Sequence, residues 1–151
     1  MSLVGQDIRI DRIRREDVQA IVELDAVHTG KDKSEWWQKR LEPLFSARGD
    51  ELTIGYVARI EEQVIGYILA EGRAWEFGSP LCGWIVAIGV HPQHSRQGVA
   101  LNLTRKVCRK FRDLGIDTVR TMVRKDDVQV LSFFRASGFH AGPFIELELE
   151  L

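Results

Sequence analysis

The 151-residue sequence has few cysteines, almost no charge imbalance and no long apolar run. Its two cysteines, Cys82 and Cys108, form no CxxC pair, which favours buried thiols over a disulfide or a metal site. A formal net charge of −1 gives no general attraction for nucleic acid or an anionic membrane. No segment reaches the length of a membrane span, and residues 1–5 lack the features of a signal peptide. We therefore expect a cytoplasmic protein that needs no metal.

The composition is that of an ordinary globular chain, with 44% apolar and 28% charged residues and no repeats or linkers. This length predicts one domain over residues 1–151. Apolar spacings of two and of three to four residues alternate along the chain, which predicts a mixed α/β domain. The strands are expected at 7–13, 52–60, 63–70, 83–90, 117–123 and 144–151, and the helices at 14–27, 34–47, 100–114 and 126–136. Pro43 argues against one regular helix throughout 34–47.

The stretch 83–110 carries the strongest chemical signal. Residues 83–90 are almost entirely apolar, which predicts a central strand, and Pro92 ends it. A helix with a sharply divided apolar face follows and begins near Gly98. The first amides of a helix have no acceptor and lie at the positive end of its dipole, so they bind anions. Gly98 lacks a Cβ and allows close approach, which points to a pyrophosphate ligand.

Residues 95–100, SRQGVA, follow the strand end IGV and Pro92, and in this frame the chain resembles the GNAT superfamily of N-acetyltransferases. The acyl-CoA signature of that family is arginine or glutamine, two residues, glycine, one residue, then glycine or alanine. Ser95 departs from the usual first residue. The segment IRRED at 13–17 and the order of helices and strands extend the resemblance along the whole chain, with a layout closest to the branch that acetylates ribosomal-protein N-termini.

The resemblance implies a mostly antiparallel mixed sheet flanked by helices, with a splayed cleft between strands four and five. It also implies acetyl-CoA as cosubstrate and direct attack by a primary amine on the thioester, without a metal. The pantetheine would lie along Ile88, Gly89 and Val90. The pyrophosphate would lie against the residues that open the following helix, namely Arg96, Gln97, Gly98, Val99, Ala100 and Leu101.

A second family motif, on the last helix, is altered in this chain. Counted back from the Gly-Phe pair at 138–139, Asp127 stands for the family asparagine, Val130 for its alanine and Phe134 for its tyrosine. The resemblance places Asp127 and Phe134 beside the cofactor. Phe134 has no hydroxyl to protonate the departing thiolate, a contribution worth about 10² to 10⁴ in rate. A thiol with a pKa near 8.5 needs only about 2 kcal/mol to leave as thiolate, so transfer is expected to persist.

The general base is open, because Met122 occupies the position of the glutamate found in the ribosomal branch. Glu71, at the end of a predicted strand, is our first candidate base, and Tyr67 on the same strand is the candidate acid. Glu76, His28 and a water relay are the alternatives. A site short of bases favours amines of low pKa, since deprotonation at pH 7 costs about 4.6 kcal/mol for lysine and about 1 kcal/mol for an α-amine.

The acceptor is also open: a protein N-terminus, a lysine or a small-molecule amine fits the pattern. Trp36 and Trp37 either line an acceptor pocket or anchor the core. The alternative function is a noncatalytic acyl-CoA-binding or sensing module, because the family tyrosine and glutamate are both absent. A nucleotide-phosphate protein is disfavoured, since no GxxxxGK[ST] pattern occurs. The alternating segment 144–151 predicts an exposed strand, which would allow a homodimer.

Overall fold

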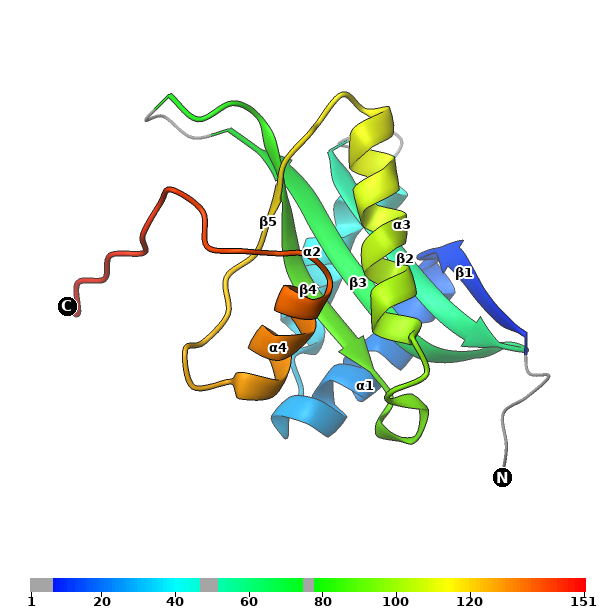
Figure 1. Cartoon of the computed structure of the whole chain (residues 1–151). Helices are drawn as coiled ribbons and strands as arrows, with labels where there is room; N and C mark the ends of the chain where they lie inside the picture. The colour runs from blue at the N-terminus through cyan, green and yellow to red at the C-terminus, as the bar shows by residue number, and fades with distance from the viewer. Residues whose placement is uncertain (1–6, 47–51, 75–77) are drawn as a thin grey trace. The chain divides into compact units, whose positions relative to one another are not determined.

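The computed structural model describes residues 7–46, 52–74 and 78–151 (Figure 1). The chain forms two compact units, residues 1–121 and 122–151. No helix within the described residues is both long and apolar enough to span a membrane. The first unit holds β1 (Ile8–Arg12), η1 (Arg15–Asp17), α1 (Val18–Thr29), α2 (Ser34–Phe45), β2 (Thr53–Ile60), β3 (Gln63–Arg73), β4 (Cys82–Val90), η2 (Pro92–His94), α3 (Val99–Asp113) and β5 (Val119–Arg120), and the second holds α4 (Val128–Ala136).

The sheet has the strand order β1-β2-β3-β4-β5. Its first three pairings are antiparallel, and the last, between β4 and β5, is parallel. A two-residue hairpin at 61–62 joins β2 to β3, and α3 provides the crossover that the parallel pair of β4 and β5 needs. The mixed, mostly antiparallel α/β architecture predicted from the sequence is confirmed.

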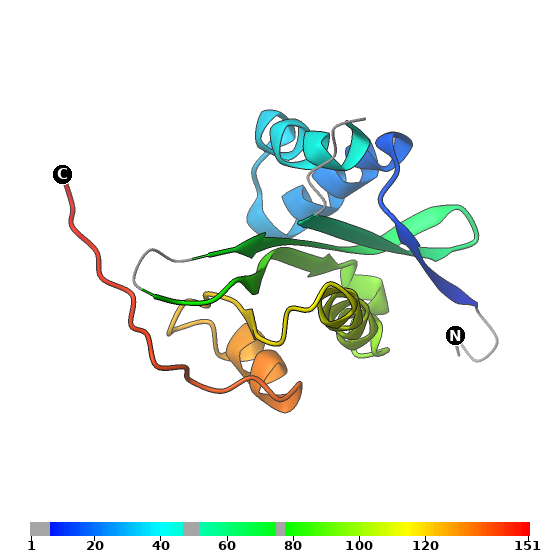
Figure 2. The same ribbon diagram turned by 90° about the horizontal axis from the view of Figure 1, so that it is seen from above.

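Helices cover both faces of this sheet. Figure 2 shows α1 and α2 on one face and α3 on the other. The spacing that predicted α3 places Leu103, Val107 and Phe111 in the core, each fully buried. Val99 is buried as well, whereas Leu114, expected on the apolar face, is 37% exposed just past the end of the helix. Two packed layers of helix therefore hold a rigid sheet between them.

Three predicted elements differ in the structure. α2 continues through Pro43 to Phe45, because a proline in the last turn removes only one amide near the helix end. The strand expected at 117–123 is paired only over Val119–Arg120. No strand is assigned to 144–151. An alternating pattern shows that a segment is suited to a sheet, but a ladder forms only where a partner strand is aligned with it.

A buried ion pair fixes the entry to α1. Both Arg59 Nη atoms donate to the Asp17 carboxylate at 2.6 Å, and Arg59 Nε donates to Asp11 at 3.1 Å. Arg59 and Asp17 are 1% and 3% exposed. Burial acts to raise the pKa of Asp17, but hydrogen bonds from Arg59 and from the Arg14 amide outweigh it and hold that pKa below its ordinary value. This pair joins η1 to β2 at Arg59, the residue before the end of the strand.

Replacing Asp17 with asparagine is expected to cost about 3–5 kcal/mol of unfolding free energy at pH 7, because it leaves Arg59 buried without its bidentate partner. Since the folded-state pKa is lowered, the stabilisation is complete above the ordinary aspartate pKa of about 3.9 and is lost as the pH falls below it. Urea unfolding of both proteins between pH 7 and pH 2 measures this, and the gap should narrow only at the acid end.

Glu16→Gln is the matched control, since Glu16 lies in the same turn and makes only an exposed 3.7 Å contact with Arg14. Its expected cost is under about 1 kcal/mol. Equal losses in the two variants would show that the Asp17–Arg59 pair contributes nothing beyond surface charge.

Candidate functional site

One edge of β4 is largely unpaired. β3 pairs with β4 along its length, but β5 meets it only at Gly83 and Trp84. Beyond that point the Thr121 hydroxyl donates to Ile85 O at 3.1 Å, so a side chain takes the place of a backbone donor. From 86 to 90 no described strand pairs with the second edge of β4, which we call the open edge. Strands four and five thus separate as predicted.

The register shows which groups face the open edge. The His91 amide donates to Ile65 O at 2.8 Å, so this residue pairs directly with β3. In an antiparallel ladder, hydrogen-bonded and non-bonded pairs alternate. Gly89, opposite Tyr67, therefore directs its backbone groups toward β3, whereas Ile88 and Val90 direct theirs toward the open edge. Two of the three predicted strand residues can pair with a ligand there.

Gly89 has a different role: because it has no side chain, it leaves space for the Tyr67 ring. A Cβ at Gly89 would lie 2.6 Å from the Tyr67 hydroxyl oxygen and 2.7 Å from its Cζ, closer than real Cβ contacts allow. Tyr67 therefore lies across the strand at this point, and glycine is the residue that permits it.

A bulge lies in β4 at Val86, a feature that the sequence did not reveal. Ala87 pairs with Leu69 and Ile85 with Ala70, which leaves Val86 without a partner in β3. Val86 and the adjacent Ala87 both pack against the core between the sheet and α1 and α2, which a regular strand would not allow. Bulges bend a strand and often lie beside active sites. The uniformly apolar run around Val86 carries no signal for one.

The turn after β4 leads to the N-terminus of α3, where the sequence predicted it. Arg96 and Gly98 have φ values of +63° and +78°. No side chain caps the helix, and the first intrahelical bond runs from the Asn102 amide to Gly98 O at 2.9 Å. The amides of Val99, Ala100 and Leu101 thus precede the first helical bond. A Cβ at Gly98 would meet no atom within 4 Å, so the space beside this turn is open.

The two predicted catalytic residues are engaged elsewhere. Tyr67 is 2% exposed, donates to Asp25 at 3.3 Å and packs edge-on against Trp37. Burial, and then the negative charge of Asp25, raise the pKa of Tyr67 well above its ordinary value. Arg73 donates to Glu71, and Arg40 lies 3.9 Å from the same carboxylate oxygen. Glu76 lies outside the described residues.

His28, the alternative base, lies at the open edge. Its Nε2 is 2.7 Å from Val90 O, and it reaches there from the last turn of α1. The sequence marked His28 only as a polar residue after a helix. Its approach to β4 depends on a contact across 62 positions, which local patterns do not encode.

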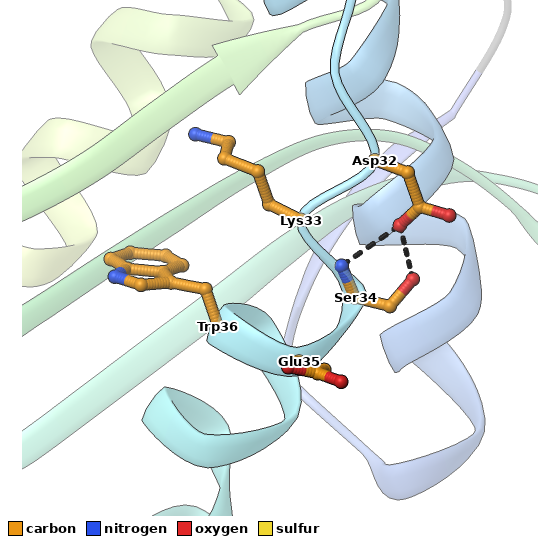
Figure 3. A pocket seen from close by; sticks show the side chains of 5 residues that line it. All are labelled: Asp32, Lys33, Ser34, Glu35 and Trp36. Carbon is orange, nitrogen blue, oxygen red and sulfur yellow. Dashed lines mark hydrogen bonds between the residues drawn. The ribbon is translucent and has the colours of Figure 1, made fainter.

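The two tryptophans of α2 have separate roles. Trp37 is 1% exposed and donates to Asp25 at 3.0 Å, so it anchors the core. Trp36 is 39% exposed, with Lys33 Nζ and Arg40 Cζ over its ring at 5.5 and 5.3 Å. An open hollow of about 530 Å³ lies beside Trp36. Figure 3 shows its lining side chains, among which the Asp32 carboxylate accepts from the Ser34 amide and hydroxyl. The lining residues are Asp32, Lys33, Ser34, Glu35 and Trp36.

The second unit contains the altered motif. Asp127 caps α4, accepting from the Val130 amide at 3.1 Å. Phe134 packs edge-on against Phe133 and Phe139, each with ring centroids 5.1 Å away. Met122 is 69% exposed. The cofactor contacts expected of Asp127 and Phe134 stay predictions. Within the described ranges, no group of three His, Cys, Asp or Glu residues could hold a metal ion.

Comparisons with known proteins give one family match and several solved structures of similar fold. A model described as the acetyltransferase (GNAT) family matches residues 18–139. The sequence matches no curated protein. Among solved structures, aminoglycoside N-acetyltransferase AAC(6')-Iy in complex with CoA is similar with a TM-score of 0.83 at 17% identity, covering 99% of both chains. The 6'-N-acetyltransferase AAC(6')-Ih of Acinetobacter baumannii gives 0.78 at 16%, covering 96% of this chain and 99% of its own. A ribosomal-protein-alanine N-acetyltransferase of Brucella melitensis biovar Abortus 2308 gives 0.76 at 14%, with the same coverage.

Tyr67→Phe is expected to lower the unfolding free energy by about 0.5–1.5 kcal/mol, the usual worth of one hydrogen bond. Catalytic turnover should stay within about twofold of the wild type, because the hydroxyl points at Asp25 inside the core. Urea unfolding and steady-state rates measure the two effects separately. Unchanged stability with a collapse of turnover would instead identify Tyr67 as the acid.

Proposed function

Because the chain belongs to the acetyltransferase (GNAT) family, we propose that it transfers the acetyl group of acetyl-CoA to a primary amine by direct attack. The observation that best supports this proposal is that two structural features, the open edge and an uncapped helix N-terminus, follow one another along the chain. The open edge of β4 leads, through a turn of eight residues at 91–98, into the uncapped N-terminus of α3. An extended amide-bearing arm and a diphosphate fit these two features, one after the other.

The chain's own groups fit each part of acetyl-CoA. Ile88 and Val90 would pair with the pantetheine amides at the open edge. The amides of Val99, Ala100 and Leu101 would hold the pyrophosphate, and the open space beside Gly98 would admit it. Acetyl-CoA supplies the thioester, whose carbonyl carbon accepts the amine lone pair while sulfur keeps the electrons of the C–S bond. A backbone amide of the open edge stabilises the charge that develops on the carbonyl oxygen.

For the acceptor, we propose an amine of low pKa. The solved structures similar to this chain include enzymes for aminoglycosides and for ribosomal-protein alanine, so both small molecules and protein N-termini belong in the test. Glu71, our first candidate base, is engaged through one carboxylate oxygen by Arg73, and Arg40 lies 3.9 Å from the same oxygen. An α-amine needs less help in losing its proton than a lysine side chain does.

Gly98→Ala is expected to weaken acetyl-CoA binding about tenfold or more, because an L side chain at φ +78° distorts the first amides of α3. Gly115→Ala is the matched control: Gly115 has a φ of +81°, also with no atom near its Cβ, but lies past the opposite end of α3. Thermal-shift titrations with acetyl-CoA, CoA and ATP measure binding through the rise in melting temperature.

Both variants should lose similar stability, and only Gly98→Ala should lose the shift caused by acetyl-CoA. Transfer of labelled acetyl to a panel of aminoglycosides, peptide α-amines and lysine peptides then tests the reaction. Binding without transfer to any amine would support the noncatalytic sensor, and efficient acetylation of lysine alone would exclude the preference for low-pKa amines.

We propose that residues 144–151 pair with a sheet edge of a second copy to form a homodimer. Ile145, Leu147 and Leu149 are 83%, 84% and 85% exposed and alternate with glutamates, so one side of this segment is apolar. Such a segment is suited to pairing as an added strand. The cytoplasmic location expected from the sequence stays a prediction.

Leu147→Glu is expected to convert this dimer to a monomer, because it places a charge on the apolar side of the segment. Light scattering after size exclusion should give twice 17.2 kDa for the wild type and 17.2 kDa for the variant. Glu148→Gln, on the polar side of the same segment, should stay dimeric. A monomeric wild type at micromolar concentration would overturn the proposal.

A further inference from the structure

The contact between His28 and Val90 places a titratable side chain at the open edge of β4. We propose that His28 is the general base that takes a proton from the acceptor amine, and this role rests on the acetyl transfer proposed above. His28 would thus take the place of the glutamate that the ribosomal branch of the family carries at the position occupied here by Met122.

The hydrogen bond determines the tautomer of His28. A backbone carbonyl can only accept, so the 2.7 Å contact between Nε2 and Val90 O requires a proton on Nε2. In the neutral imidazole the other nitrogen, Nδ1, then carries the lone pair. A histidine held by a carbonyl at one nitrogen has a defined basic atom at the other, and this is the arrangement that a general base needs.

The position of His28 suits proton transfer at the thioester. Ile88 and Val90 direct their backbone groups to the open edge, and the two residues are separated by about 6.6 Å at 3.3 Å per strand residue. The His28 imidazole, which contacts Val90 O, therefore lies about two strand residues from the Ile88 amide. Because His28 comes from α1, it reaches the open edge from the face of the sheet opposite α3, leaving the phosphate-binding turn clear.

The charged groups around His28 leave it available. On α1, the Asp25 carboxylate accepts from Trp37 and Tyr67 and pairs with Lys33 at 3.1 Å. On the strand side, His91 Nδ1 accepts from the Gln93 amide at 3.1 Å. In the described part of the chain His28 makes no ion pair, and Val90 O is its one hydrogen-bond partner. Glu71, by contrast, is held between two arginines.

The proposed proton step is balanced as follows. One N–H bond of the acceptor ammonium breaks, its electron pair stays on the amine nitrogen, and the proton bonds to His28 Nδ1. The amine then uses that pair to form the new C–N bond, and the C–S bond of the thioester breaks with its electron pair on sulfur, as the thiolate. Water later removes the proton from the imidazolium, and the second amine proton neutralises the thiolate. No oxidant, reductant or metal is required.

His28→Gln separates proton transfer from hydrogen bonding, because a glutamine amide can still donate to Val90 O but cannot take a proton near neutrality. At pH 7, kcat/KM is expected to fall about 10²-fold or more, the usual range for a general base. The wild-type and variant rates should converge at high pH, where solvent alone deprotonates the amine. The affinity for acetyl-CoA, measured by calorimetry, should stay within about twofold.

A second readout does not depend on turnover. Nitrogen-15 NMR of the free wild-type protein should show His28 as the Nε2–H tautomer at high pH. His140→Gln is the matched control for the kinetics, because His140 is also exposed and its Nδ1 lies 3.1 Å from a backbone carbonyl, that of Ala141. This variant should keep the wild-type pH profile.

The outcomes separate this inference from the proposed function. If the wild type transfers acetyl and His28→Gln retains its rate, or if NMR shows the Nδ1–H tautomer, the base assignment is wrong while the acetyltransferase stands. If His28→Gln loses affinity for acetyl-CoA in proportion to its rate, His28 binds cofactor and is not the base. If the wild type transfers acetyl to no amine, both proposals fail.

Discussion

The candidate site depends on one asymmetry in hydrogen bonding: β4 is paired along its length on one edge and through only two residues on the other. An unpaired edge inside a sheet leaves backbone donors and acceptors unsatisfied, which costs free energy unless a ligand or water pairs with them. The ladder with β3, unbroken from Ala87 to Val90, holds those groups in a fixed line. A ligand that adds itself as a strand therefore meets preorganised partners and loses little entropy in ordering them.

A buried carboxylate, that of Asp25, anchors α1, the helix that brings His28 to the open edge. Asp25 holds α1 to α2 through Trp37 and to β3 through Tyr67, at 3.0 and 3.3 Å. His28 follows three positions later, one helical turn onward and on the same side of α1. The orientation of α1 that Asp25 enforces is thus the orientation that brings the imidazole to Val90. Tyr67, which the sequence suggested as an acid, contributes by positioning the helix.

The sequence predicted well wherever structure follows local periodicity. The apolar spacing of Leu103, Val107 and Phe111 specifies both α3 and the face that it buries, and the proline turn before it marks the helix start. Features that depend on distant partners were missed or misassigned. The bulge at Val86 lies in a run with no alternation, and the contacts of Tyr67 and His28 join positions 42 and 62 residues apart. Residues 144–151 have a strand pattern without an aligned partner.

We propose that the residues at the two altered family positions, Phe134 and Met122, affect which amine reacts more than whether transfer occurs. Holding an amine against a thioester in a reactive geometry is worth about 7–11 kcal/mol, and we propose that the backbone groups of Ile88 and Val90 provide this positioning without any side-chain acid. Without the tyrosine the CoA sulfur leaves as a thiolate, and this costs only about 2 kcal/mol at pH 7 because a thiol has a pKa near 8.5. The free energy of removing a proton from the acceptor amine then decides which amine reacts. At pH 7 it is about 1 kcal/mol for an α-amine and about 4.6 kcal/mol for lysine. With His28 as the proposed base, the lower of these two costs is the easier one to meet, which is why we propose acceptors of low pKa.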